Sequence, residues 1–190
     1  MTSAAPLLEL FPQPGEWTEA DYFPLSDRGR LVELSDGQVE VLPVPTDFHQ
    51  LILLRLASAL YAFVALHKLG QIRFAPLPVR LWEGKIREPD FMFMSAAHAA
   101  RIGAYWGVPD LVGEILSEGT EQKDRETKRA EYARAGIPEY WIVDPWARTV
   151  ERLRLAGQEY ELIETITDSG QLTSPEFPGW QLSLAELFAE

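Results

Sequence analysis

The stretch PDLVGEILSEGTEQKDRETKRAEYARAGIPEYWIVDP, residues 109–145, determines the class of fold. Residues 110–117 are a nearly continuous apolar run, which is typical of a strand covered on both faces of a sheet. Residues 121–135 are predicted to form a helix that Gly136 ends. Residues 140–143 predict a further strand. This succession of strand, helix and strand indicates an α/β protein.

Capping and turn signals predict the elements before this stretch. Thr18 and Asp21 are spaced as a helix start and predict a helix over residues 18–25. An Asp-Gly turn at 36–37 predicts a hairpin between residues 31–34 and 38–42. A long helix is expected over residues 47–68, capped by Thr46 and ended by Gly70. Because this helix is apolar almost all round, we expect most of its circumference to be buried.

The remaining elements complete a mixed sheet flanked by helices. Strands are predicted at 71–75, 77–82, 89–94, 149–155 and 159–165, and short helices at 96–102 and from about 183. Two prolines at the start of the second of these strands, Pro76 just before it and Pro78 within it, favour an edge or bulged position. With no repeat or linker, we expect a single domain over residues 1–190. It would have an N-terminal extension at 1–30, a core at about 31–155, and a C-terminal ribbon and helix at 156–190.

Composition limits the chemistry of the chain. Its 190 residues carry no cysteine and three histidines, which excludes disulfides, thiolate metal sites and a cysteine nucleophile. A bound metal would depend on carboxylates, which suits Mg²⁺ or Mn²⁺. The opening residues lack a basic flank, and the apolar run at 51–66 is too short to span a bilayer, so we expect a cytoplasmic protein without a membrane partner.

The formal net charge of −12 argues at first against a nucleic-acid partner. The acidity is concentrated at the two ends, however, since residues 1–47 and 155–190 each carry a net charge of −7. Residues 48–154 carry a net charge of +2. The charge therefore predicts weak, strongly salt-sensitive binding to nucleic acid and does not exclude it.

Two carboxylates stand in apolar strands, where an unpaired charge is costly. Asp90 and Glu114 each alternate with apolar residues, and one divalent ion could neutralise both if their strands are neighbours. Alternatively, each pairs with an arginine or caps a backbone group. Asp124, Lys128 and Tyr132 share one face of the following helix, so Lys128 could point at the carboxylates. Its alternative is a solvated surface pair with Asp124.

These residues occur within a longer pattern of motifs. Glu33-Leu34-Ser35-Asp36-Gly37 is followed by His49, by Pro89-Asp90 and by the dense block at residues 109–145. In this order they resemble the Uma-type family of putative restriction endonucleases, within the PD-(D/E)xK nuclease superfamily. The resemblance covers about residues 31–155. It implies a restriction-endonuclease-like core with a divalent-metal site.

The resemblance also implies roles for individual residues. Asp90 matches the metal-binding aspartate and Glu114 the second acid. Lys128 matches a lysine on the following helix, because the usual lysine position of the superfamily is Leu116 here. The other matching or supporting positions are Glu33 near the metal, His49 as a proton shuttle or a buried core histidine, and Ser117, Asp124 and Tyr132 as supports. Gly113 replaces a branched apolar residue, which we expect to be a tolerable packing change.

The function expected from this resemblance is Mg²⁺- or Mn²⁺-dependent hydrolysis of phosphodiester bonds in nucleic acid, with DNA as the substrate. Cleavage of a duplex needs two sites, and a homodimer is the commonest way to present them. The alternative function is a catalytically silent nucleic-acid- or protein-binding module that retains the nuclease fold. Intact Asp90, Glu114 and Lys128 favour the enzyme, whereas the acidity of the chain favours the alternative.

Overall fold

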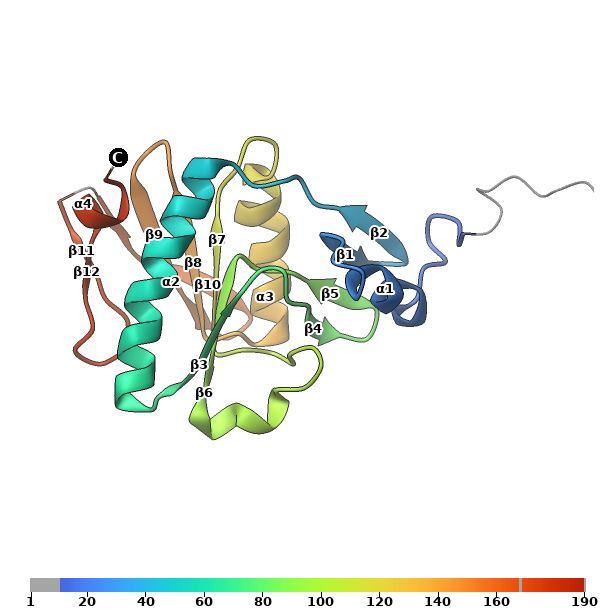
Figure 1. The fold of residues 1–190 in the computed structure, drawn as a ribbon, viewed down its shortest axis with the longest axis horizontal. Helices are drawn as coiled ribbons and strands as arrows, with labels where there is room; N and C mark the ends of the chain where they lie inside the picture. Colours follow the sequence, from blue (N-terminus) through green and yellow to red (C-terminus); the bar gives the residue numbers. More distant parts are fainter. Residues whose placement is uncertain (1–10, 168, 190) are drawn as a thin grey trace, which may run out of the picture.

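A six-stranded mixed sheet forms the centre of the molecule in the computed structural model, which describes residues 11–167 and 169–189 (Figure 1). The strand order is β10-β9-β8-β7-β6-β3. The strands are β3 (Gly70–Phe74), β6 (Phe91–Ser95), β7 (Leu111–Ile115), β8 (Glu139–Asp144), β9 (Thr149–Ala156) and β10 (Glu159–Ile166). Strands β7 and β8 are parallel and all other neighbours are antiparallel. The predicted mixed sheet is confirmed.

A smaller antiparallel sheet lies beside the central one, in the order β2-β1-β5-β4. Its strands are β1 (Val32–Ser35), β2 (Gln38–Val41), β4 (Val79–Trp82) and β5 (Lys85–Arg87), and α1 (Glu19–Ser26) packs against β1. The predicted capping box of Thr18 and Asp21 starts α1. Strand β4 is an edge strand with a register shift, as the two prolines before it predicted. Strand β5 and the short pair β11 (Gln171–Leu172) and β12 (Leu182–Ser183) were not predicted.

The central sheet is buried on both faces. Phe91 and Phe93 of β6 join the core under α2 (Asp47–His67) and α4 (Leu184–Leu187), whereas Met92 and Met94 join the core on the side of α3 (Arg129–Ala135). Figure 1 shows α2 and α3 running alongside this sheet. Side-chain alternation along each strand therefore feeds two separate cores.

Helix α2 differs from its prediction in burial and in its end. Thr46 caps it as predicted, accepting a hydrogen bond from the His49 N–H. One face is buried against the sheet, but Tyr61 and Leu66 on the other face are exposed, so the expectation of burial around most of the helix was wrong. The left-handed residue at its end is Lys68, not Gly70, which begins β3. By length and hydropathy alone α2 could cross a membrane, yet its buried face is part of the core.

The predicted helix over residues 121–135 contains an unpredicted π-helical segment. This segment, η3 (Lys123–Lys128), leads directly into α3, and Gly136 ends the helix in the left-handed conformation as predicted. The helix predicted at residues 96–102 is the 3₁₀ helix η2 (Ala96–Arg101). A π-helical segment inside an α-helix frequently marks a functional site.

Gly113 of β7 is packed more tightly than its sequence indicates. A Cβ atom placed at Gly113 would lie 2.0 Å from the ring of Phe91, which is directly opposite it in the neighbouring strand. The Phe91 ring is fully buried and meets Trp141 edge-on at 5.7 Å. Phe91 thus fills the volume that a branched side chain would occupy, so glycine at 113 is a tolerable packing change as expected, whereas a branched residue at 113 alone would clash with the ring.

We predict that Gly113→Val destabilises the protein by about 1–3 kcal/mol, because the Phe91 ring has no free space to move into. Urea denaturation followed by circular dichroism measures this loss. In the background of Phe91→Ala, which leaves a cavity, Gly113→Val should cost less or even stabilise. Equal costs in both backgrounds would show that Phe91 is not the obstacle.

Candidate active site

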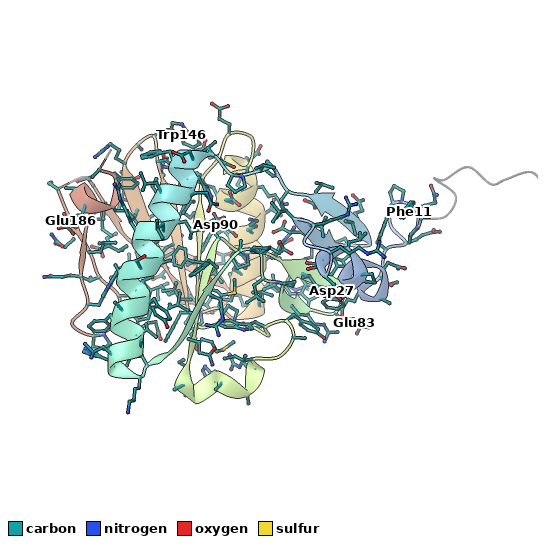
Figure 2. The ribbon with its side chains drawn as sticks, in the orientation of Figure 1. Phe11, Asp27, Glu83, Asp90, Trp146 and Glu186 are labelled. Atoms are coloured by element: carbon teal, nitrogen blue, oxygen red, sulfur yellow. The ribbon has the colours of Figure 1, made fainter. Side chains whose placement is uncertain are left out.

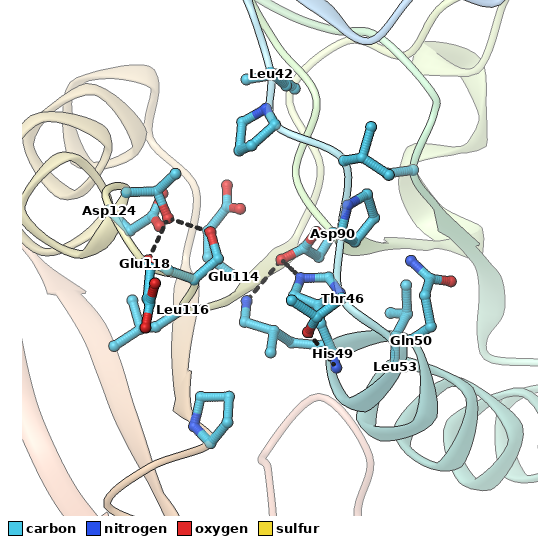
Figure 3. Close-up of a pocket in the computed structure, with 18 of the residues that line it drawn as sticks. Leu42, Thr46, His49, Gln50, Leu53, Asp90, Glu114, Leu116, Glu118 and Asp124 are labelled. Atoms are coloured by element: carbon cyan, nitrogen blue, oxygen red, sulfur yellow. Dashed lines mark hydrogen bonds and ion pairs between the residues drawn. The ribbon is translucent and has the colours of Figure 1, made fainter.

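A cavity of about 660 Å³ lies where β7 ends, β6 begins and α2 starts (Figure 3). Strands β6 and β7 are antiparallel neighbours with Phe91 paired to Gly113. Because the strands are antiparallel, the residue before Phe91 lies opposite the residue after Gly113, which brings Asp90 beside Glu114. Both residues line the cavity. Strand β6 begins two residues later than predicted, so Asp90 precedes the strand and is not part of it.

Asp90 is fixed from two sides by its Oδ2 atom. It accepts a hydrogen bond of 2.7 Å from the Ile115 N–H and lies 3.1 Å from His49 Nε2, as Figure 3 shows. Burial opposes a charge on His49, but the contact with Asp90 outweighs it and raises the histidine pKa. Asp90 therefore accepts a hydrogen bond from a backbone group, which was one of the two alternatives to a metal ion. Its Oδ1 atom has no hydrogen-bond partner among the described residues.

Glu114 and Lys128 form the buried centre of the site. Lys128 Nζ lies 2.9 Å from Glu114 Oε1 and 2.9 Å from Asp124 Oδ1, and the Tyr132 hydroxyl donates to Glu114 Oε1 at 2.6 Å. Burial raises the pKa of Glu114, assisted by Asp124 and Asp90 and opposed by Lys128. Burial also opposes the charge on Lys128, but Glu114 and its other carboxylate neighbours hold the lysine pKa well above its usual range. Lys128 is buried, so the alternative of a solvated surface pair was wrong.

Glu33 lies behind Lys128 and does not line the cavity. Its Oε1 atom is 3.7 Å from Lys128 Nζ, and its Oε2 atom accepts from Arg87 and Lys123 at 2.8 Å each. Burial opposes its charge, but Lys128, Arg87 and Lys123 together lower the pKa of Glu33 to about 2. The structure thus brings Glu33 to the lysine of the site and not to the face where Asp90 and Glu114 meet the cavity.

Ser117 lines the cavity without touching the central group. Its hydroxyl lies 2.9 Å from that of Thr120, at the turn that leads into η3. This contact stabilises the approach of the helix that carries Asp124 and Lys128. Ser117, Asp124 and Tyr132 thus each contact another group, namely Thr120, Lys128 and Glu114, and their supporting roles in a reaction stay a prediction.

Sequence reasoning missed a second layer of charged residues. Arg87 is fully buried and joins Glu33 to Glu131 of α3, with Nε 2.7 Å from Glu131 Oε2. Lys85 reaches the same Glu131 at 2.9 Å. Glu88, two residues before Asp90, lines the cavity and accepts from the Tyr22 hydroxyl at 3.1 Å, and burial raises its pKa to about 7. Its adjacency to the Pro89-Asp90 motif was the one signal that could have indicated it.

The donor atoms of the cavity suit a hard divalent cation. Among residues 11–167 and 169–189, no group of three or more histidine or acidic side chains is arranged to enclose an ion. Mg²⁺ commonly takes only one or two carboxylates and completes its shell with water and substrate phosphate. Asp90 Oδ1 and Glu114 Oε2 accept no hydrogen bond from the described residues, which leaves both atoms open for such an ion. Asp90 and Glu114 are therefore the residues that would hold it.

The fold and this cavity define a mixed α/β protein with paired carboxylates and a buried lysine at the end of its central sheet. Comparison of the sequence with known families gives one match, over residues 18–185, to the Uma2 family, described as "putative restriction endonuclease". The match spans most of the chain, which therefore belongs to this family, and the predicted resemblance is confirmed.

A solved structure shares the fold. It is the crystal structure of a putative nuclease belonging to DUF820 from Anabaena variabilis ATCC 29413, with a TM-score of 0.75 and 20% sequence identity. The alignment covers 90% of this chain and 97% of that one. No curated protein matches the sequence. The structural likeness confirms the fold class that the resemblance implied.

We predict that Glu33→Gln destabilises the protein by on the order of 3 kcal/mol at pH 7, because it removes the buried counter-charge that Arg87 and Lys128 share. The pKa of Glu33 is about 2 in the folded state and about 4.3 in an unfolded chain. Its stabilisation is thus fully present above about pH 4.3 and is lost as the pH falls towards 2. Urea denaturation between pH 3 and 7 should show the gap between wild type and variant closing with acid.

The matched control is Glu40→Gln. Glu40 is paired with Glu33 across the β1–β2 hairpin and contacts the same Lys123, but it is partly exposed. Glu40→Gln should cost no more than about 1 kcal/mol. If the two variants lose the same stability, the buried network around Glu33 does not have the strength assigned to it.

Proposed function

We propose that this protein is a divalent-metal-dependent nuclease that hydrolyses phosphodiester bonds in DNA. Family membership supports a nuclease in general terms, and the substrate, metal dependence and site residues are our proposal. The observation that carries it is the meeting of Asp90, Glu114 and Lys128 at one cavity from three separate elements. Cleavage of duplex DNA would further require a homodimer, so that each strand meets a site.

The residues around the cavity would divide the work among them. A divalent cation at Asp90 and Glu114, Mg²⁺ or Mn²⁺, would polarise a phosphoryl oxygen and make a nearby water more acidic. Lys128 supplies a permanent positive charge that stabilises the negative charge developing on phosphate. Tyr132 holds Glu114 at 2.6 Å, and His49 and the Ile115 N–H hold Asp90. These contacts orient both carboxylates before substrate arrives, which lowers the cost of assembling the site.

His49 has a second role in this proposal. Its Nε2 atom faces Asp90, and its Nδ1 atom is buried with no hydrogen-bond partner among the described residues. The ring lies in the first turn of α2, and the residue lines the cavity. No protein contact competes for Nδ1, so His49 would act as the proton shuttle if water or substrate in the cavity reaches this atom.

We predict that purified protein cleaves DNA in Mg²⁺ or Mn²⁺ and that EDTA abolishes the cleavage. Lys128→Met should lower the rate by about 10²–10³, by analogy with the loss of one charge-stabilising group. Asp90→Asn and Glu114→Gln should lower it at least as far. Gel assays on plasmid, duplex and single-stranded DNA measure the rates.

The matched control for these variants is Glu126→Gln, an exposed carboxylate on the same helix as Lys128. Its rate should equal that of the wild type. Cleavage that persists unchanged in Lys128→Met, or no cleavage of any substrate with either metal, would contradict the proposal. The second result would favour the silent binding module.

We predict that Mn²⁺ binds the free protein and raises its melting temperature, because an ion at Asp90 and Glu114 binds the folded state alone. At a Mn²⁺ concentration one hundred times the dissociation constant, the stabilisation should be about 2.7 kcal/mol. Asp90→Asn should weaken Mn²⁺ binding in calorimetric titration, and Glu126→Gln should not. Equal Mn²⁺ affinity in both variants would place the ion elsewhere.

A further inference from the structure

Trp146 is an exposed aromatic residue at the edge of the cavity. Its side chain is 56% exposed, whereas Trp106, Trp141 and Trp180 are buried. It lies in the turn between β8 and β9 and lines the same cavity as Asp90. Figure 2 shows Trp146 near the N-terminal end of α2. Its exposed indole is not part of the core of the fold, and because it lines the cavity it is available to pack against a ligand there.

The turn that carries Trp146 is held rigidly. Asp144 Oδ1 accepts hydrogen bonds from the backbone N–H groups of Trp146 at 3.0 Å and Ala147 at 2.9 Å. Asp144 Oδ2 in turn accepts from Arg125 at 3.2 Å. Because the backbone is already fixed, the indole loses little conformational freedom when a ligand packs on it.

A second apolar wall faces the cavity from the segment between β2 and α2. Pro43, Val44 and Pro45 line it, and Val44 is 85% exposed. The two prolines restrict the backbone of this segment. Val44 and Trp146 are thus two large exposed apolar side chains that share one cavity, although they are about a hundred residues apart in the sequence.

The charges of the cavity do not favour binding through phosphate alone. Two lysines line it, Lys123 and Lys128, and both are already paired with carboxylates. Five carboxylates line it as well: Glu88, Asp90, Glu114, Glu118 and Asp124. A ligand with dense phosphate charge and no exposed base would find little attraction here. A ligand that offers an aromatic face beside one phosphodiester would gain from the apolar walls, and only its single phosphate would need a divalent cation to offset the acidic floor.

We propose that the cavity takes an unpaired nucleotide of single-stranded nucleic acid, whose base stacks on Trp146 while the adjoining phosphodiester lies over Asp90 and Glu114. This inference rests on the proposed nuclease function and defines its substrate class. In a duplex the base faces are covered by their neighbours, whereas in a single strand they are free to stack on aromatic side chains. One protomer then suffices for cleavage.

Binding of short fluorescent oligonucleotides, measured by anisotropy, tests this assignment without requiring cleavage. The probes are single-stranded DNA, RNA of the same sequence and the DNA duplex, each in EDTA and again with Ca²⁺, which is also ligated by oxygen. We expect wild type to bind a single strand more tightly than the duplex. Trp146→Ala should weaken single-strand binding about tenfold or more, the loss of one stacked base. Trp146→Phe should retain most of the affinity.

The matched control is Tyr61→Ala, which removes another exposed aromatic residue, 60% exposed on α2 and not part of the cavity. Its affinity should equal that of wild type. Protection of exposed tryptophan from acrylamide quenching by bound single strand gives a second measurement, with Trp146→Phe as its control because Trp17 and Trp82 are also partly exposed. Tighter binding of RNA than of DNA, with the same dependence on Trp146, supports the assignment and identifies RNA as the source of the base.

Three results would overturn the assignment: no single-strand binding in either buffer, duplex binding as tight as single-strand binding, or a Trp146→Ala variant that binds as wild type does. Trp146-dependent binding by a protein that cleaves nothing would reject the nuclease function and support the assignment. Cleavage of duplex DNA that is indifferent to Trp146 would do the opposite. The two proposals therefore fail separately.

Discussion

The charge on Lys128 is the constraint on which the arrangement of the site depends. A buried ammonium group is tolerated only when carboxylates surround it closely. Here Glu114 of β7 and Asp124 of η3 each lie 2.9 Å from it, and Glu33 of β1 lies 3.7 Å away. Two sheets and one helix thus meet at a single nitrogen atom. None of the three can shift by much without exposing an uncompensated charge.

The ion pairs behind Lys128 extend this constraint to the small sheet. Arg87 joins Glu33 to Glu131, so that β1, β5 and α3 share one guanidinium group. Buried ion pairs contribute little net stability, because desolvation offsets most of their attraction, and an apolar replacement often serves stability better. Their presence beside the cavity is therefore better explained by the need to hold Lys128 and Glu114 in one geometry. This need for a fixed geometry distinguishes the buried network from the exposed ion pairs on the surface of the protein.

The sequence was sufficient for those parts of the site that depend on local pattern. Strand alternation predicted that Glu114 lies among apolar side chains, and helical spacing put Asp124, Lys128 and Tyr132 on one face of the next helix. Whether Lys128 reaches the carboxylates depends on how the two elements pack, which local pattern does not give. The contacts of Glu33 were not predictable, because its partners Arg87 and Lys123 are 54 and 90 residues away. The exposed face of α2 was missed because apolar composition does not reveal which side of a helix the sheet covers.

The acidity of the cavity does not exclude nucleic-acid binding, because the attraction for phosphate and the attraction for a base come from different side chains. Five carboxylates and two paired lysines line it, so phosphate gains little until a divalent cation reduces the negative charge. The apolar surface of Trp146 and Val44 is insensitive to that charge and can hold a base before or after the ion arrives. A site of this kind gives up the long-range attraction that a basic groove exerts on duplex DNA. It instead selects a strand whose bases are already unpaired, since only such a strand can use the stacking surface.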